Sequence, residues 1–266
     1  MFSDLRLHVW AHLKFFLRNR LVLGLMLAAA AFWAMGFIPF LMWESTGGRF
    51  ERLRYLSTQM HGLVWFYGAL LALVAMSAHL RDRSTRLVFT RATRPEIWLV
   101  SVFAAATLVT VVAHALTAAA TLGLSLAWNI PYQIGFAWLA LDAMIESAIV
   151  VALLSTLAVG IHPIIAIAAL FLFGDNITYY LYTMLSGAEY ANALGAWGIA
   201  GKWLARGAYT VMPMFDPFAN ETRAVSASLR VTGRDWAYLG AAAAYGSLVA
   251  TFCFFAATFT LRRRAL

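Results

Sequence analysis

Six long apolar runs limit what this chain can fold into. A bilayer-spanning α-helix needs ~20 apolar residues, because it rises ~1.5 Å per residue across a hydrocarbon core of ~30 Å. The runs lie at Leu21–Trp43, about Thr58–Leu80, Ile97 to about Leu122, about Gly135–Gly160, Pro163 to about Leu185, and Trp236–Leu261. Hydrophobic residues make up 62% of the chain and charged residues 12%, too little charge to cover a soluble globule. We therefore predict an all-α polytopic membrane protein with six transmembrane helices.

Positive charges are concentrated in three segments, which are residues 1–20, residues 81–94 and the tail at 262–264. In a six-span arrangement all three segments lie on one side of the membrane, and an excess of Arg and Lys marks the cytoplasmic side. The net charge of +8 is thereby assigned to membrane topology rather than to nucleic-acid binding. Only Lys14 and Lys202 among the 20 basic residues are lysines, a bias typical of GC-rich bacterial genomes. We predict a bacterial cytoplasmic (inner) membrane protein with both termini in the cytoplasm.

Residues 1–20 are predicted to form an interfacial amphipathic helix, followed by the six-helix transmembrane domain at residues 21–266. On a helical wheel one arc is apolar and the other is polar. The apolar arc contains Phe2, Leu5, Val9, Trp10, Leu13, Phe16 and Leu17, and the polar arc contains Asp4, His8, His12, Lys14, Arg18 and Asn19. A helix of this kind lies in the plane of the membrane surface.

A few ionisable and amide side chains fall inside the predicted spans: His114, Asp142, Glu146, Asp175 and Asn176. The two acids at 142 and 146 share a helix face, and helix rise places the whole set in the outer half of the bilayer. Charges there are costly and should face protein or water. Two interpretations stay open, a polar lining of a translocation path and interhelical hydrogen bonding. A metal site is not expected, because no histidine pairs with the acids at helical spacing.

The other histidines with a predicted position are His61, His79 and His162, which lie near the ends of predicted spans. We expect them at the membrane interface rather than among ligands. Residues 44–57, which mix acids with arginines, are expected to form an outer loop between the first two spans.

The segment RDRSTRLVFTRATRPE, Arg81–Glu96, connects the second and third spans and contains five arginines. Cytoplasmic location alone accounts for the arginines. It does not account for the apolar triplet Leu87–Phe89 in a short aqueous connection, and Ser84 or Thr85 is suited to cap a short helix before it. We interpret the triplet as a docking element for a partner protein.

With an interfacial helix, six spans, this basic segment, a long outer loop and an arginine tail, the chain resembles a type-2 ABC transporter permease. The local resemblance consists of charged residues, Ser-Thr where the family has Gly-Thr, the apolar triplet, Thr-Arg and an acid that opens the next span. In the family this segment forms the cytoplasmic coupling helix that docks on the ATP-binding subunit. The residues implied in coupling are Arg81, Arg83, Ser84, Thr85, Arg86, Leu87, Val88, Phe89, Arg91, Arg94 and Glu96.

A phosphate-binding P-loop requires G-x-x-x-x-G-K-[ST], and the sequence lacks it. The one Gly-Lys pair, Gly201-Lys202, has Ala196 where the first glycine is required and Trp203 after the lysine. The resemblance therefore implies that two separate ATP-binding subunits hold ATP and Mg, and that this chain is not itself an enzyme and holds no cofactor or metal. It also implies an exporter built with a second permease copy or a sister permease. The alternative is a structural or assembly subunit of a larger membrane complex.

The outer loop at residues 186–235 contains the stretch Gly195–Met212, which is too apolar for an ordinary loop. Family members have helices here that dip back into the outer leaflet. A re-entrant element and a surface-lying amphipathic helix without a transport role are both compatible with this composition.

Overall fold

The computed structural model describes residues 2–20, 48–81, 95–161, 195–204 and 219–265, together with positions 23, 24, 27, 31, 165 and 166. These described residues are helical, with short turns between helices and no β-strand. The labelled helices are α1 (Phe2–Arg18), α3 (Arg49–Arg81), α5 (Pro95–Ala127), α6 (Ile134–Gly160), α10 (Ala219–Ser228) and α11 (Gly233–Ala265). They all belong to one compact unit, Met1–Gly160 with Phe218–Leu266, and residues Ile161–Pro217 form a second unit.

Within the described residues, α3, α5, α6 and α11 are long and apolar enough to cross a membrane. They match four of the six predicted spans, and the protein is all-helical with the features of a polytopic membrane protein. The predicted spans at Leu21–Trp43 and Pro163–Leu185 fall outside the described residues, apart from isolated positions.

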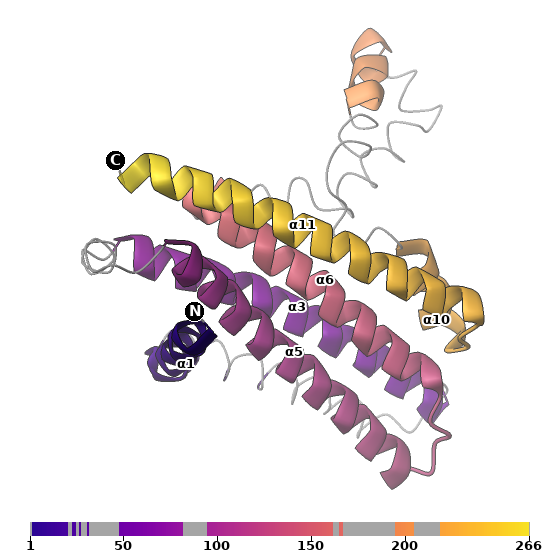
Figure 1. The fold of residues 1–266 in the computed structure, drawn as a ribbon. Helices are drawn as coiled ribbons and strands as arrows, with labels where there is room; N and C mark the ends of the chain where they lie inside the picture. Colours follow the sequence, from indigo (N-terminus) through magenta and orange to yellow (C-terminus); the bar gives the residue numbers. More distant parts are fainter. Residues whose placement is uncertain are drawn as a thin grey trace. The chain divides into compact units, whose positions relative to one another are not determined.

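The four long helices run alongside one another, with α6 in contact with α3, α5, α10 and α11 (Figure 1). The contact between α6 and α11 is close, because a Cβ on Gly246 would lie 3.2 Å from the side chain of Ile149. Thr156 of α6 also donates a hydrogen bond of 3.1 Å to the Cys253 carbonyl of α11. The first unit is thus a helical bundle built around α6.

One end of this bundle holds the end of α3, the beginning of α5, the end of α11 and the helix α1 (Figure 1). Arg262 near the end of α11 forms an ion pair with Glu96 at the beginning of α5. We call this the basic end, because Arg81, Arg262 and the basic residues of α1 lie there. The opposite end, which we call the turn end, holds the beginnings of α3 and α11, the α5–α6 turn and α10.

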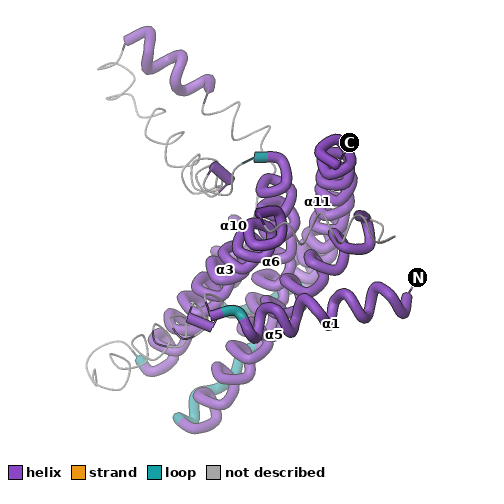
Figure 2. The backbone as a smooth tube through the Cα atoms, turned by 90° about the vertical axis from the view of Figure 1, so that its left-hand side faces the viewer, coloured by secondary structure: helices purple, strands orange, loops and turns teal. Residues whose placement is uncertain are grey.

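The helix α1 runs crosswise to the long helices and packs on α5 (Figures 1 and 2). The prediction for its polar arc was wrong at His12, which is buried against α5 and meets Trp98 edge to face, with ring centroids 6.2 Å apart. Phe16, one turn further on, is buried as well. Leu7 and Trp10 are exposed on the other side of α1, so this short helix has two apolar faces, one for α5 and one turned outward.

The helix α3 begins at Arg49, and the prediction of an outer loop over residues 44–57 was wrong for residues 49–57. The charged residues in the first turns of α3 were predicted as loop, but charged residues are compatible with a helix in water. Here Glu51 and Arg54 pair one turn apart, and Arg54 also donates a hydrogen bond to the Ala227 carbonyl near the end of α10. With 33 residues, α3 is ~50 Å long and exceeds the ~30 Å hydrocarbon core of a bilayer.

The apolar core of the turn end joins α3, α6, α10 and α11. It comprises Leu53, Ile130, Phe136, Trp138, Leu139, Val225, Leu229 and Leu239. Leu229 follows α10 in the left-handed backbone region, with φ 52°, and its amide bonds to the Val225 carbonyl at 2.6 Å. Leu229 packs so closely on α6 that only Gly135, which has no Cβ, fits beneath its backbone.

Besides its apolar core, the bundle buries polar side chains and exposes large apolar ones along its long helices. Hydroxyl and imidazole groups are buried between the long helices, at Ser57, His61, Thr110, His114, Thr117, Thr121, Ser125 and Ser147. Large apolar side chains are exposed along α5 and α11, at Leu108, Val112, Leu116, Leu248, Phe252, Phe255 and Phe259. Apolar outer faces and polar helix contacts are the pattern expected of helices surrounded by lipid.

In the second unit, residues 195–204 form a short helix that begins at Gly195, whose φ is +54°. Its large apolar side chains Trp197, Ile199, Trp203 and Leu204 are exposed. A helix in this part of the predicted outer loop agrees with the apolar composition of Gly195–Met212, and its re-entrant placement stays a prediction.

Replacing Gly135 by alanine should lower the free energy of unfolding by roughly 1–3 kcal/mol, because the new Cβ would lie 2.5–2.7 Å from backbone atoms of Leu229. The matched control is Gly123→Ala in α5, where no atom lies within 4 Å of the added Cβ. Thermal unfolding of the detergent-solubilised chain measures both. Equal melting temperatures for the two variants would contradict the close packing of Leu229 on α6.

Candidate functional site

A chain of three polar side chains joins α3, α5 and α6 inside the bundle. Nδ1 of His61 and Nδ1 of His114 are 2.9 Å apart, and Nε2 of His114 is 2.8 Å from Oγ of Ser147. The two imidazole rings stack with centroids 5.2 Å apart and planes inclined by 27°. His114 is 0% exposed, His61 6% and Ser147 1%. His114 therefore uses both ring nitrogens to hold two neighbouring helices.

These three side chains meet at the middle of α6, because Ser147 is thirteen residues from each end of that helix, Ile134 and Gly160. Within α5, His114 is nineteen residues from Pro95 and thirteen from Ala127, nearer the turn end, and its depth in a bilayer stays a prediction. His61, which was predicted to lie near a span end, is buried and lies twelve residues inside α3. The helix α3 begins nine residues before Thr58, where the second span was predicted to begin, and the position of His61 relative to a membrane boundary stays a prediction.

Buried hydroxyls extend the polar contact between α3 and α5 in both directions. Most of them are satisfied by their own helix, because Thr110, Thr117 and Thr121 each donate to the carbonyl four residues earlier at 2.7–3.0 Å. Thr121 also lies 3.4 Å from Oγ of Ser57 on α3. Towards the basic end, Gly68 of α3 faces Thr110 so closely that a Cβ on it would lie 2.7 Å from the threonine methyl. We call this contact the polar seam.

Asp142 is buried and accepts a hydrogen bond of 2.8 Å from the hydroxyl of Thr222 on α10. At ~100° per residue, positions 142 and 147 lie about 140° apart around α6. Asp142 therefore faces α10 while Ser147 faces α5. The structure does not bring the predicted path residues Asp142 and His114 together.

Glu146 is half-buried on α6 and next in sequence to Ser147. With Asp142 it is one of two acidic residues in α6, and α5 contains no charged side chain beyond Glu96. In α3 the stretch between Arg54 and Arg81 likewise has no charged residue apart from histidines. The polar seam between α3 and α5 is therefore built from hydroxyl and imidazole groups, without Asp, Glu, Lys or Arg side chains.

Two of the predicted path residues, Asp175 and Asn176, lie outside the described part of the chain, as do His79 (side chain) and His162. The coupling residues between positions 82 and 94 lie outside it too. The two ends of the coupling segment are described, with Arg81 as the last residue of α3 and Glu96 in the first turn of α5. Among the described residues, no group of three or more His, Cys, Asp or Glu side chains is arranged to hold a metal ion.

Sequence reasoning missed His61, Ser147 and Thr222 as partners of the residues it selected. A pattern was present in α5, where a polar residue recurs every three or four positions at Thr110, His114, Thr117, Thr121 and Ser125. This spacing marks one face of a helix, and in an apolar run it predicts a polar helix contact. The partner helices leave no comparable pattern, because isolated serines such as Ser147 are common in any span.

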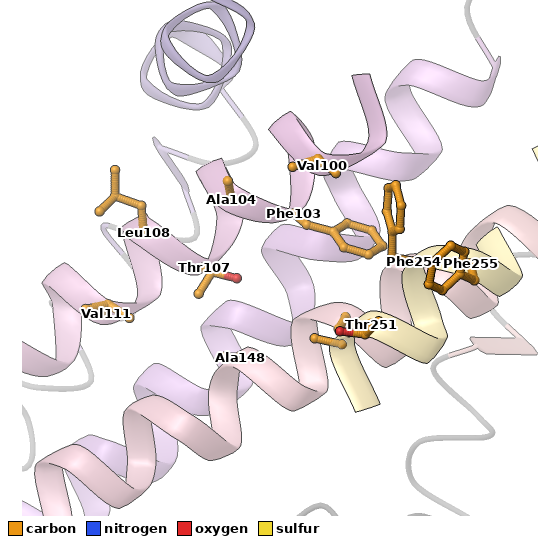
Figure 3. Close-up of a pocket in the computed structure, with 12 residues that line it drawn as sticks. Val100, Phe103, Ala104, Thr107, Leu108, Val111, Ala148, Thr251, Phe254 and Phe255 are labelled. Atoms are coloured by element: carbon orange, nitrogen blue, oxygen red, sulfur yellow. The ribbon is translucent and has the colours of Figure 1, made fainter. Parts of the chain in front are cut away.

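A separate hollow of about 610 Å³ lies between α5, α6 and α11 (Figure 3). Figure 3 shows the rings of Phe103 and Phe254 lying next to each other in it, with Ala148 on the α6 side. Among the described residues no ionisable side chain lines the hollow, and Leu108 and Phe255 at its margin are exposed. Its chemistry suits hydrocarbon chains rather than polar ligands.

The chain matches no model of a protein family, and the searches of curated proteins and of solved structures find no match. The fold and the site define a helical membrane protein with a polar centre shared by three helices.

Replacing His114 by alanine should lower the free energy of unfolding by roughly 2–4 kcal/mol, because it opens a cavity and leaves His61 and Ser147 without a partner. Thermal unfolding in detergent measures the loss. The matched control is Thr117→Val, which removes a hydroxyl of the same seam that bonds only its own helix among the contacts seen here. A His114→Ala variant as stable as this control would contradict the role of His114 in holding the helices.

Proposed function

We propose that this chain is the transmembrane subunit of an ATP-driven exporter of the type-2 ABC permease kind. Two separate ATP-binding subunits, which hold ATP and Mg, dock on the basic connector between α3 and α5. A second copy of the chain or a sister permease completes the translocation path. The complex lies in a bacterial cytoplasmic membrane with both termini of this chain in the cytoplasm.

The observation that carries this proposal is the way the basic connector is attached to the bundle. Its two ends, Arg81 and Pro95, belong to helices of 33 residues each, which exceed the thickness of a bilayer core. On the α5 side, Glu96 is tied to Arg262 of α11 and Trp98 packs on His12 of α1. A force on the connector is therefore transmitted to three helices at once.

The ends of the described helices also support six spans. The helix α1 lies at the basic end, whereas α3 begins at the turn end. In the same way α6 ends at the basic end, whereas α10 lies at the turn end, where Thr222 meets Asp142. Both intervening stretches, residues 19–48 and 161–218, thus connect opposite ends of the bundle. Each contains one of the two predicted apolar runs, which supports two further crossings.

The position of α1 supports a location at the membrane surface on the basic side. It crosses the ends of the long helices, exposes Leu7, Trp10 and Leu17, and places Lys14 5.4 Å from the Trp10 ring centroid. Exposed apolar groups next to a cation suit the boundary between acyl chains and lipid phosphates.

A non-transport role as a structural or assembly subunit remains the competing proposal, because the polar seam would stabilise helix packing equally well in such a protein. The two proposals differ in the partner that they require. A permease requires a stoichiometric partner with a P-loop, and a structural subunit does not.

Replacing Leu87, Val88 and Phe89 together by alanine should abolish binding of the ATP-binding subunit, because the apolar surface that docks in the partner is removed. The protein, tagged at its C-terminus and expressed from its own chromosomal locus, is purified from solubilised membranes. Mass spectrometry then determines whether a protein with G-x-x-x-x-G-K-[ST] is retained in stoichiometric amount, and whether the pool hydrolyses ATP.

The matched control replaces Leu122 and Leu126 by alanine, two exposed leucines of α5 near the turn end. The partner should be retained by the wild type and by this control. A stoichiometric partner without a P-loop would favour the structural role, and retention of the ATPase by the triple variant would contradict docking on the connector.

A further inference from the structure

The contacts of His114 allow two arrangements of hydrogen atoms. In the first, the Ser147 hydroxyl donates to Nε2 of His114, and Nδ1–H of His114 donates to Nδ1 of His61. In the second, Nδ1–H of His61 donates to Nδ1 of His114, and Nε2–H of His114 donates to Oγ of Ser147. The heavy-atom distances of 2.9 and 2.8 Å suit both, because each neutral imidazole has one donor and one acceptor nitrogen.

In both arrangements the far nitrogen of His61, Nε2, has no hydrogen-bond partner among the described residues, although it is buried. It carries a hydrogen in the first arrangement and a lone pair in the second. An unpaired polar atom in a buried position is unfavourable and requires a physical reason for its presence. One turn further along α3, Nε1 of Trp65 is also buried and has no partner within the part of the chain that the structure describes. The row of hydrogen-bonded side chains therefore ends on α3 at Nε2 of His61, which can still bond a proton donor or acceptor.

We propose that His61, His114 and Ser147 form a proton-transfer chain at the middle of the helical bundle. A hydronium ion at the open end protonates Nε2 of His61, whose Nδ1 proton moves to Nδ1 of His114. The Nε2 proton of His114 moves to the Ser147 oxygen, and the original hydroxyl proton of Ser147 passes to a water molecule. One proton enters and one leaves, both rings are neutral before and after, and the second arrangement has become the first.

The surroundings favour transfer over fixed ion pairing. Apart from Glu51 and Glu96 in the first turns of α3 and α5, the acidic groups of these three helices are Asp142, which faces α10 and Thr222, and Glu146, next to Ser147. The flanking hydroxyls of Thr110 and Thr117 are committed to carbonyls of α5. Rows of histidine and other titratable groups within a membrane are the usual construction of proton relays. A second transfer in the same direction requires the two imidazole rings and the Ser147 hydroxyl to rotate back to the second arrangement. The packing of α3, α5 and α6 therefore controls the rate of repeated proton transfer.

Proton transfer is measured with the full-length chain reconstituted into phosphatidylcholine liposomes that contain a pH-sensitive dye. An inside-negative potassium diffusion potential drives proton entry. The wild type should acidify the interior at least about tenfold faster than His61→Gln or His114→Gln, because each variant removes a positioned proton acceptor. No ATP-binding subunit is present, so the result is independent of the proposed transport function.

The matched control is Thr117→Val, which changes the same seam but leaves the chain intact and should keep the wild-type rate. Equal rates for the wild type and both glutamine variants would overturn the proposal. A loss of the same size in Thr117→Val would overturn it too, because the effect would then follow from disturbed packing.

A second measurement uses only the wild type and does not depend on the folding of variants. With ¹⁵N-labelled histidine in nanodiscs, the proposal predicts scalar coupling across a hydrogen bond between the two Nδ1 atoms. The absence of this coupling in the folded protein would overturn the proposal.

Discussion

The hydrogen bonds on the two sides of His114 are the interaction on which the arrangement of α3, α5 and α6 depends. In a lipid environment apolar side chains do not distinguish one neighbour from another, since lipid tails are as apolar as leucine. The buried threonines of α5 do not distinguish neighbours strongly either, because their hydroxyls bond carbonyls of their own helix. The imidazole of His114, by contrast, does not bond a carbonyl of its own helix and needs partners on other helices. His114 is satisfied by His61 on one side and Ser147 on the other, which sets the register of three helices at once.

The two ends of the bundle differ in how they are held together. At the turn end, apolar side chains of α6, α10 and α11 pack around Trp138, and Leu229 lies directly on Gly135. At the basic end, Met76, Leu99 and Leu261 are buried, α1 packs on α5, and an exposed ion pair joins Glu96 to Arg262. Exposed ion pairs contribute little to stability. The attachment of the connector between α3 and α5 to these packed helices suits its proposed role as the point where a partner acts.

The sequence predicted the elements whose cause is local. The apolar runs located α5, α6 and α11 to within a few residues, because the length of a span is imposed by the bilayer. The beginning of α3 was missed, since its first turns are charged. They continue the helix beyond the apolar run from which the span was predicted. His114 could be selected as an isolated polar group in an apolar run. Its partners could not, because pairing across helices depends on register, and neither His61 nor Ser147 carries information on that register. The separation of Asp142 from His114 around α6 has the same origin.

The central claim, that α3 and α5 pack along a polar seam, is tested most directly by a disulfide across that seam. Ser57 and Thr121, whose hydroxyl oxygens are 3.4 Å apart, are replaced by cysteine, and the native Cys253 by serine. Mild oxidation of membranes should join residues 57 and 121 rapidly within one chain, as detected by mass spectrometry of the linked peptides, and leave either single-cysteine variant unlinked. The absence of this disulfide in folded protein would contradict the packing of α3 on α5 and the polar centre that it creates.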